Sequence, residues 1–167
     1  MNESLFKAYD IRGKYPEEIN ENFAYIIGKS YGSYLKKFLD KNKCVIGMDN
    51  RLSSKSLKTA ITIPMHYYTR YIENTYGIMV TASHNPKDDN GFKFSFDKLA
   101  NARGEMIEDF KEFTFQGNFL DGNGKCEERT IKEQYLKYLQ DNIQINNKSV
   151  KVVFDPGNGV TSTIIKD

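Results

Sequence analysis

Short apolar runs alternate along this chain with longer segments that carry apolar residues at helical spacing. The apolar runs occupy residues 5–11, 44–48, 77–81 and 91–96. After Asn20, a good N-cap residue, apolar side chains recur every three or four positions, which predicts an amphipathic helix. Further helices are expected after Ser53 and within residues 104–113. This alternation predicts an α/β domain with a mixed, mainly parallel sheet covered by helices.

The domain organisation is indicated by a fresh apolar run near the end of the chain. Residues 151–154 follow a polar stretch and lead into the turn Asp155-Pro156-Gly157-Asn158-Gly159. We therefore assign residues 1–147 to a first domain and residues 148–167 to the first strand and turn of a second, similar domain. A single strand cannot bury its own apolar face, so these last residues are too few to form a domain. We therefore expect that the sequence stops at the start of the second domain.

Composition excludes several classes of protein. With 167 residues, 39% of them hydrophobic, the chain can bury one sizeable core and is not disordered. Its apolar runs are far shorter than the roughly 20 residues of a membrane span, and its N-terminus does not resemble a signal peptide. We therefore expect a cytoplasmic protein that has no membrane partner.

Charge and cysteine content exclude two further kinds of site. The net charge is +2, and basic residues are interleaved with acidic ones, so no nucleic-acid partner is expected. The two cysteines, Cys44 and Cys126, lack the spacing of a metal site. Because Cys44 begins an apolar run, it is expected to be buried.

The segment from Thr81 to Pro86 carries the chemistry that the sequence predicts. Ser83 follows an apolar run, at the edge of the sheet where α/β proteins bind ligands. His84 is adjacent, and Lys93 returns on the next strand, so the serine can act as a nucleophile or phosphate carrier. A polar turn with a hydrogen-bonding serine explains the same residues, and the pattern alone favours that alternative.

Four motifs occur in order along the chain. They are Phe6-Lys7-Ala8-Tyr9-Asp10-Ile11-Arg12-Gly13, Gly47-Met48-Asp49-Asn50-Arg51, Thr81-Ala82-Ser83-His84-Asn85-Pro86 with Asn90-Gly91-Phe92-Lys93, and Val153-Phe154-Asp155-Pro156-Gly157-Asn158-Gly159. Together they resemble the α-D-phosphohexomutase family, in its phosphomannomutase/phosphoglucomutase branch. The resemblance covers the family's N-terminal domain and the start of its second domain.

The resemblance implies an intramolecular phosphotransferase, an isomerase that acts on mannose or glucose phosphates. Phosphate moves between the 1- and 6-positions of the hexose through a phosphoserine and a hexose 1,6-bisphosphate, which also serves as activator. The resemblance further implies Mg²⁺, bound by the serine phosphate and by aspartates of the second domain. Such chemistry depends on positioning and on charge neutralisation.

Site residues are carried over by motif position. Ser83 matches the phosphoserine and, through its phosphate, one metal ligand. His84 and Lys93 match catalytic residues that contact phosphate or assist proton transfer. Tyr9 and Arg12 match substrate- and phosphate-binding residues at the lip of the site. A core aromatic and a surface arginine are the structural alternatives for these last two.

Two departures from the family limit what the chain is expected to do alone. The metal-binding loop, the sugar-selecting loop and the phosphate-binding loop of the later domains are absent from these 167 residues. We therefore expect an inactive fragment whose partners are the remaining domains of the same enzyme. A non-catalytic remnant, or an assembly or binding domain of phosphohexomutase origin, is the alternative.

The second departure is an apparent internal deletion near residues 62–65. The stretch between Leu57 and Gly77 is shorter than in the family, by about one helix end and one strand. Three explanations stay open: a segment omitted or excised from the sequence, a decayed gene, or a fold that tolerates the loss.

Overall fold

The computed structural model describes residues 1–57, 75–96, 101–122, 127–144, 146, 149, 151–157 and 159–165. The apparent deletion near 62–65 and Cys126 lie outside these residues. The described strands are β1 (Ile11–Lys14), β2 (Cys44–Met48), β3 (Tyr76–Val80) and β4 (Asp89–Ser95). The helices are α1 (Glu21–Leu39), α2 (Leu52–Leu57), α4 (Glu105–Gln116) and α5 (Lys132–Asn142), with short 3-10 turns η1 (Glu3–Leu5) and η3 (Val160–Thr163).

The described strands form one mixed sheet in the order β1-β4-β3-β2. β2 and β3 run parallel, whereas β4 runs antiparallel to both β1 and β3. This arrangement confirms the α/β class. It also brings the carboxyl ends of β1, β2 and β3 to the edge of the sheet at which β4 begins.

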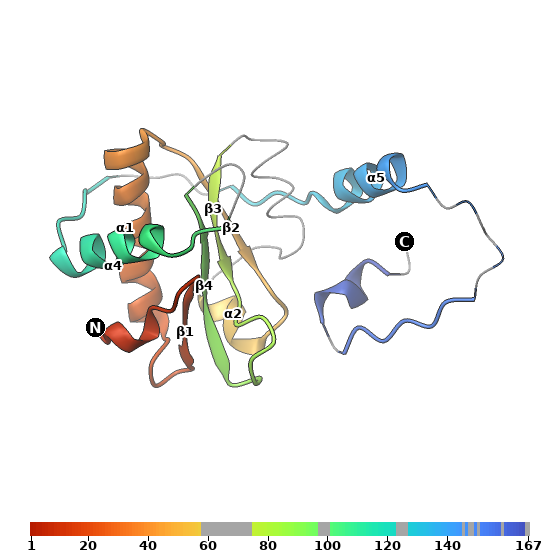
Figure 1. Cartoon of the computed structure of the whole chain (residues 1–167), viewed down its shortest axis with the longest axis horizontal. Coiled ribbons are helices and arrows are strands. Elements are labelled where there is room, and N and C mark those ends of the chain that lie inside the picture. The colour runs from red at the N-terminus through yellow and green to blue at the C-terminus, as the bar shows by residue number, and fades with distance from the viewer. Residues whose placement is uncertain are drawn as a thin grey trace.

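Helix α1 forms where the periodicity predicts it. The Asn20 side chain accepts a hydrogen bond of 3.0 Å from the backbone N–H of Phe23 and so caps the helix. Asp40, in a left-handed conformation, ends it. The buried face has a spacing of four residues, with Phe23, Ile27, Tyr31 and Leu35 packed in the core. Figure 1 shows α1 and α4 together on one side of the sheet.

The two faces of the sheet differ in character, because successive side chains in a strand point to opposite faces. Phe92 and Phe94 lie in the core, where their rings pack near Phe23 and Tyr31 of α1. Gly91 and Lys93 alternate with them, and Arg12 pairs with Gly91. Arg12 and Lys93 therefore lie on the face of the sheet opposite α1.

Tyr31 is the most enclosed aromatic residue of the core. It is 1% exposed and donates a hydrogen bond of 2.7 Å from its hydroxyl to the carbonyl oxygen of Ser95. Burial raises the pKa of Tyr31 well above its ordinary value of 10.0. The phenol therefore stays protonated in the folded protein beyond the pH at which an exposed tyrosine ionises.

Three expectations from the sequence were wrong. Residues 5–11 do not form one strand: the main-chain N–H of Lys7 donates to the carbonyl of Asp10, so the chain turns and β1 begins only at Ile11. Cys44 is exposed, because β2 is the last strand in the described order. Residues 151–154 form no strand and are exposed, since no described strand pairs with them.

Helix α5 and the segment after it lie to one side of the sheet (Figure 1). None of the side chains of α5 is buried. Within the ranges that the structure describes, no helix is long and apolar enough to cross a membrane.

Candidate active site

Ser83 lies in a loop that joins the carboxyl end of β3 to the start of β4. The strand ends at Val80, and two buried residues, Thr81 and Ala82, lead to the exposed Ser83. Ser83 has a φ of 57°, a left-handed conformation that non-glycine residues rarely adopt. This placement matches the prediction that Ser83 follows a strand at the edge of the sheet.

The loop is held by the carboxylate of Asp49, which follows β2. Asp49 is 9% exposed and accepts hydrogen bonds from the hydroxyls of Ser54 at 2.6 Å and Thr81 at 2.7 Å. The Thr81 hydroxyl oxygen in turn accepts the backbone N–H of Ser83 at 2.9 Å. A buried charge on one strand end thereby fixes the backbone of Ser83.

Arg51 completes this support. Its Nε lies 3.1 Å from Asp49 Oδ2. Its two terminal nitrogens donate to backbone carbonyls of the serine loop, namely those of Ser83, Asn85, Pro86 and Asp89. Asp49 and Arg51 therefore hold the serine loop together.

Gly91 allows β1 to approach β4 closely. A Cβ at this position would lie 2.0 Å from the carbonyl oxygen of Ile11, too close for any side chain. Arg12 pairs with Gly91 in the sheet, so the close approach also brings Arg12 toward the serine loop. Arg12 Nη1 donates to Asn85 Oδ1 at 2.8 Å, which links β1 to that loop directly.

Arg12 and Lys93 are joined by Asp10. Nε of Arg12 and Nζ of Lys93 both lie 2.8 Å from the same oxygen, Oδ2 of Asp10. Asp10 is 1% exposed, and its other oxygen, Oδ1, has no hydrogen-bond partner among the residues described. Asp10, which the sequence analysis did not single out, thus joins Arg12 to Lys93, and Arg12 in turn is bonded to the serine loop.

The predicted site residues line two neighbouring hollows. Ser83 and Lys93 line the first, together with Asp49 and Arg51. Tyr9 and Arg12 line the second, which has a volume of about 680 Å³. His84 and Asn85 line both.

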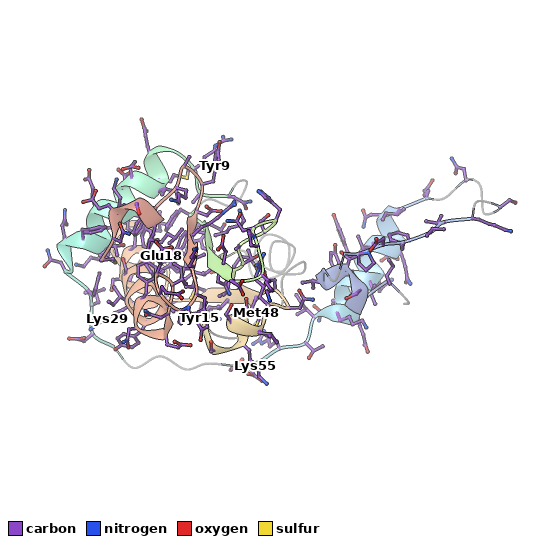
Figure 2. The ribbon with its side chains drawn as sticks, turned by 90° about the horizontal axis from the view of Figure 1, so that it is seen from below. Tyr9, Tyr15, Glu18, Lys29, Met48 and Lys55 are labelled. Carbon is purple, nitrogen blue, oxygen red and sulfur yellow. The ribbon has the colours of Figure 1, made fainter. Side chains whose placement is uncertain are left out.

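Tyr9 is not a core residue. It is 62% exposed and projects away from the body of the domain (Figure 2). The core alternative is therefore wrong for Tyr9. The surface alternative is wrong for Arg12, whose side chain is 19% exposed and bonded to Asp10 and Asn85.

Three supporting residues were missed by the sequence analysis: Asp10, Asn85 and Asn90. The signal for Asp10 was its place two residues before Arg12, close enough in sequence for the carboxylate and the guanidinium to pair. Asn90 is fully buried and donates to the hydroxyls of Ser53 and Ser54. No local pattern predicts such contacts, since the partners lie 36 or more residues away in the chain.

Metal ligands do not gather in the described part of the chain. There, no group of three or more His, Cys, Asp or Glu side chains is placed to hold a metal ion. Three carboxylates around the serine loop are already engaged: Asp10 pairs with Arg12 and Lys93, Asp49 pairs with Arg51, and Asp89 accepts a hydrogen bond from the Asn85 side chain. These residues by themselves do not fit a divalent cation.

Fold and loop together define an α/β domain that presents a serine beyond a strand, with two cations held beside it. The family profile of "Phosphoglucomutase/phosphomannomutase, alpha/beta/alpha domain I" matches residues 3–63 and 60–120. The chain therefore belongs to the phosphoglucomutase/phosphomannomutase family, of which it contains domain I.

Individual relatives agree with this assignment. The chain is 34% identical to a phosphomannomutase of Salmonella typhimurium over an alignment of 186 positions, which covers 97% of this chain and 40% of the relative. It is 34% identical to a phosphomannomutase/phosphoglucomutase of Pseudomonas aeruginosa, over 96% of this chain and 38% of that protein. The chain thus spans about two fifths of the length of these relatives.

Solved structures share the fold. A phosphoglucomutase/phosphomannomutase family protein of Burkholderia thailandensis superposes with a TM-score of 0.75 at 25% identity, over 88% of this chain and 37% of that chain. A putative phosphomannomutase of Thermus thermophilus superposes with a TM-score of 0.69 at 20% identity, over 83% of this chain and 36% of that chain.

Proposed function

We propose that this chain is the phosphoserine domain of a phosphohexomutase that moves phosphate between the 1- and 6-positions of mannose or glucose phosphates. In this proposal Ser83 accepts a phosphoryl group from the sugar and returns it to the other position through a hexose 1,6-bisphosphate. His84 and Lys93 contact the phosphate or assist proton transfer. Tyr9 and Arg12 bind the substrate at the lip of the site.

One observation carries the proposal: Ser83 is exposed on a loop to which both Arg51 and Arg12 are hydrogen-bonded, and Lys93 pairs with the same carboxylate as Arg12. Arg12 reaches the loop through Asn85, and Lys93 shares Asp10 with Arg12. Phosphoryl transfer needs such preset positive charge, because the protein's contribution is positioning and electrostatic stabilisation. The names of the relatives support the same chemistry.

Mg²⁺ enters this proposal from the family resemblance. Ser83, through its phosphate, is the ligand that this chain is proposed to supply, and the aspartates are assigned to a later domain. When bound, the ion would neutralise charge on the transferring phosphoryl group. The remaining domains of the same enzyme and the hexose phosphate are therefore the proposed partners. We propose the cytoplasm as the compartment.

The domain assignment of residues 1–147 and 148–167 belongs to the same proposal, with an internal deletion near 62–65. The alignment to the Salmonella typhimurium protein is longer than this chain, so that relative carries residues that have no counterpart here. The two stretches that match the family profile overlap at residues 60–63, next to the proposed deletion.

Two measurements test the proposal. The purified chain is incubated with glucose 1,6-bisphosphate and Mg²⁺, and its intact mass is followed. Ser83→Ala is the test variant, and Ser149→Ala, at an exposed serine that lines neither hollow, is the matched control. We expect one phosphoryl group on the wild type and on Ser149→Ala, located at residue 83, and none on Ser83→Ala. Phosphate at another residue, or equal labelling of Ser83→Ala, would contradict the assignment of Ser83.

The second measurement is a coupled assay with glucose 1-phosphate or mannose 1-phosphate. A single transfer to Ser83 can accumulate slowly, but we expect no turnover by the 167-residue chain alone, because the resemblance places the metal, sugar and second phosphate sites needed for repeated cycles in domains that these residues do not include. Removing one well-placed stabilising group already costs about a hundredfold in rate. Turnover that disappears in Ser83→Ala would show that the chain is a complete catalyst.

The alternative is a non-catalytic domain of phosphohexomutase origin that binds a phosphorylated ligand. The same two hollows would then bind the phosphorylated ligand, but no phosphoryl group would be transferred to Ser83. Binding of glucose 1,6-bisphosphate with no phosphoryl group gained at residue 83 would favour this alternative.

A further inference from the structure

We propose that Asp10 is a positioning residue, whose buried carboxylate sets Arg12 and Lys93 in place beside the serine loop before a phosphate arrives. This inference rests on the proposed function, because it concerns the same phosphate site. Asp10 is 1% exposed, so it acts on the ligand only through the two cations.

The first observation is that one oxygen of Asp10 serves both cations. Arg12 Nε and Lys93 Nζ each lie 2.8 Å from Oδ2. The two cationic nitrogens therefore lie within about 6 Å of each other, a distance at which like charges repel. The shared carboxylate offsets this repulsion and leaves one net positive charge, which still attracts an anion.

The second observation is that Asp10 is incompletely satisfied. Oδ1 is buried and has no hydrogen-bond partner among the described residues. A buried carboxylate oxygen without a donor lowers stability, so a residue selected for stability alone would be paired at both oxygens. The asymmetry indicates that Asp10 serves to bring two cations to one point.

The third observation is that both cations keep donors for a ligand. A guanidinium has five N–H groups and an ammonium has three. Among the described residues, Arg12 uses Nε for Asp10 and Nη1 for Asn85, and Lys93 uses one proton for Asp10. Arg12 is thus fixed at two points and Lys93 at one, while their other N–H groups can meet phosphate oxygens without rearrangement.

The test compares Asp10→Asn with Asp121→Asn in the ¹⁵N-labelled 167-residue chain. Asp121 is the matched control because its carboxylate also accepts from a cation at 2.8 Å, Nζ of Lys29, but on the exposed surface. Two readouts are taken by NMR: solvent exchange at Arg12 Nε–H, and the Kd for glucose 1,6-bisphosphate from the same signal.

Positioning and simple charge neutralisation make opposite predictions. If Asp10 only neutralised the cations, its removal would leave a more positive site, and the bisphosphate would bind as well or better. We expect instead a Kd raised at least tenfold in Asp10→Asn, with faster exchange at Arg12 Nε–H, and no change in Asp121→Asn. Equal or tighter binding by a folded Asp10→Asn variant would overturn the proposal.

A second variant covers the case in which Asp10→Asn does not fold. Asp10→Glu keeps the charge but moves the carboxylate by one methylene, so we expect weaker binding and faster exchange in the same direction. An unchanged Kd and unchanged exchange in Asp10→Glu would overturn the proposal. If the wild type does not bind the bisphosphate, the proposed function fails, while exchange at Arg12 Nε–H in the variants still decides whether Asp10 positions Arg12.

Discussion

Arg51 donates a hydrogen bond of 3.1 Å from Nη2 to the carbonyl oxygen of Ser83, 32 residues later in the chain. The same guanidinium bonds three further carbonyls of the loop and the carboxylate of Asp49. The conformation of Ser83 therefore depends on the end of the neighbouring parallel strand. Strand pairing and site geometry are coupled at this point.

Replacing Arg51 by Met is expected to lower the free energy of unfolding by about 3 kcal/mol, because it leaves the buried carboxylate of Asp49 without its cation. Arg51→Lys should recover part of this loss, since a lysine restores the charge but not the planar fork. Urea denaturation followed by circular dichroism measures both. Lys36→Met is the control, because its pair with Asp40 is exposed and should contribute less than about 1 kcal/mol. An equal effect of Lys36→Met and Arg51→Met would contradict this account.

Ser83→Gly is expected to stabilise the fold while removing the phosphate acceptor. A non-glycine residue in a left-handed conformation costs roughly 1–3 kcal/mol, and glycine relieves this cost. The greater flexibility of glycine in the unfolded chain takes back about 0.5–1 kcal/mol of the stability gained. We therefore predict a gain of about 1 kcal/mol in the free energy of unfolding. Ser83→Ala keeps the Cβ and loses only the hydroxyl, so it should lie close to the wild type. Equal stability of the two variants would show that Ser83 is not strained.

Features that depend on residues close by in the sequence were predictable, whereas features that depend on contacts between distant parts of the chain were not. The N-cap at Asn20 and the place of Ser83 after a strand follow from local pattern and from the alternation of strands and helices. The exposure of Cys44 depends on which strand lies at the edge of the sheet, and the role of Asp10 depends on Lys93, 83 residues away. Long-range contacts of this kind have no period or spacing from which they could be inferred.

Gly91→Ala is expected to separate β1 from β4. The new Cβ would lie 2.0 Å from the Ile11 carbonyl oxygen, and a backbone group can only move away with its strand. We predict a loss of about 3 kcal/mol in the free energy of unfolding, which is the upper end of the usual range for substitutions that overpack a site. The control is Gly32→Ala in α1, where a Cβ meets nothing within 4 Å. That variant should gain about 0.5–1 kcal/mol from helix propensity. A harmless Gly91→Ala variant would contradict the observed register.

Alkaline pH should destabilise the wild type more steeply than Tyr31→Phe. At pH 7 the variant is expected to be less stable by about 1 kcal/mol, because it loses the hydrogen bond to the Ser95 carbonyl. Burial raises the pKa of Tyr31 in the folded protein well above the 10.0 that it has when unfolded. Once the pH passes 10, the unfolded chain therefore releases this proton while the folded chain retains it.

The sign of this effect follows from linkage. Releasing a proton only in the unfolded state favours unfolding, so the stability contributed by Tyr31 is complete below pH 10 and declines above it, by up to about 1.4 kcal/mol per pH unit. Phenylalanine has no proton to release, so the unfolding curves of wild type and Tyr31→Phe should converge between pH 10 and 11. Tyr25→Phe, at a tyrosine that is 72% exposed, should instead follow the wild type across the range. Urea denaturation at several pH values measures the difference, and a constant gap between wild type and Tyr31→Phe above pH 10 would show that the phenol of Tyr31 ionises in the folded protein.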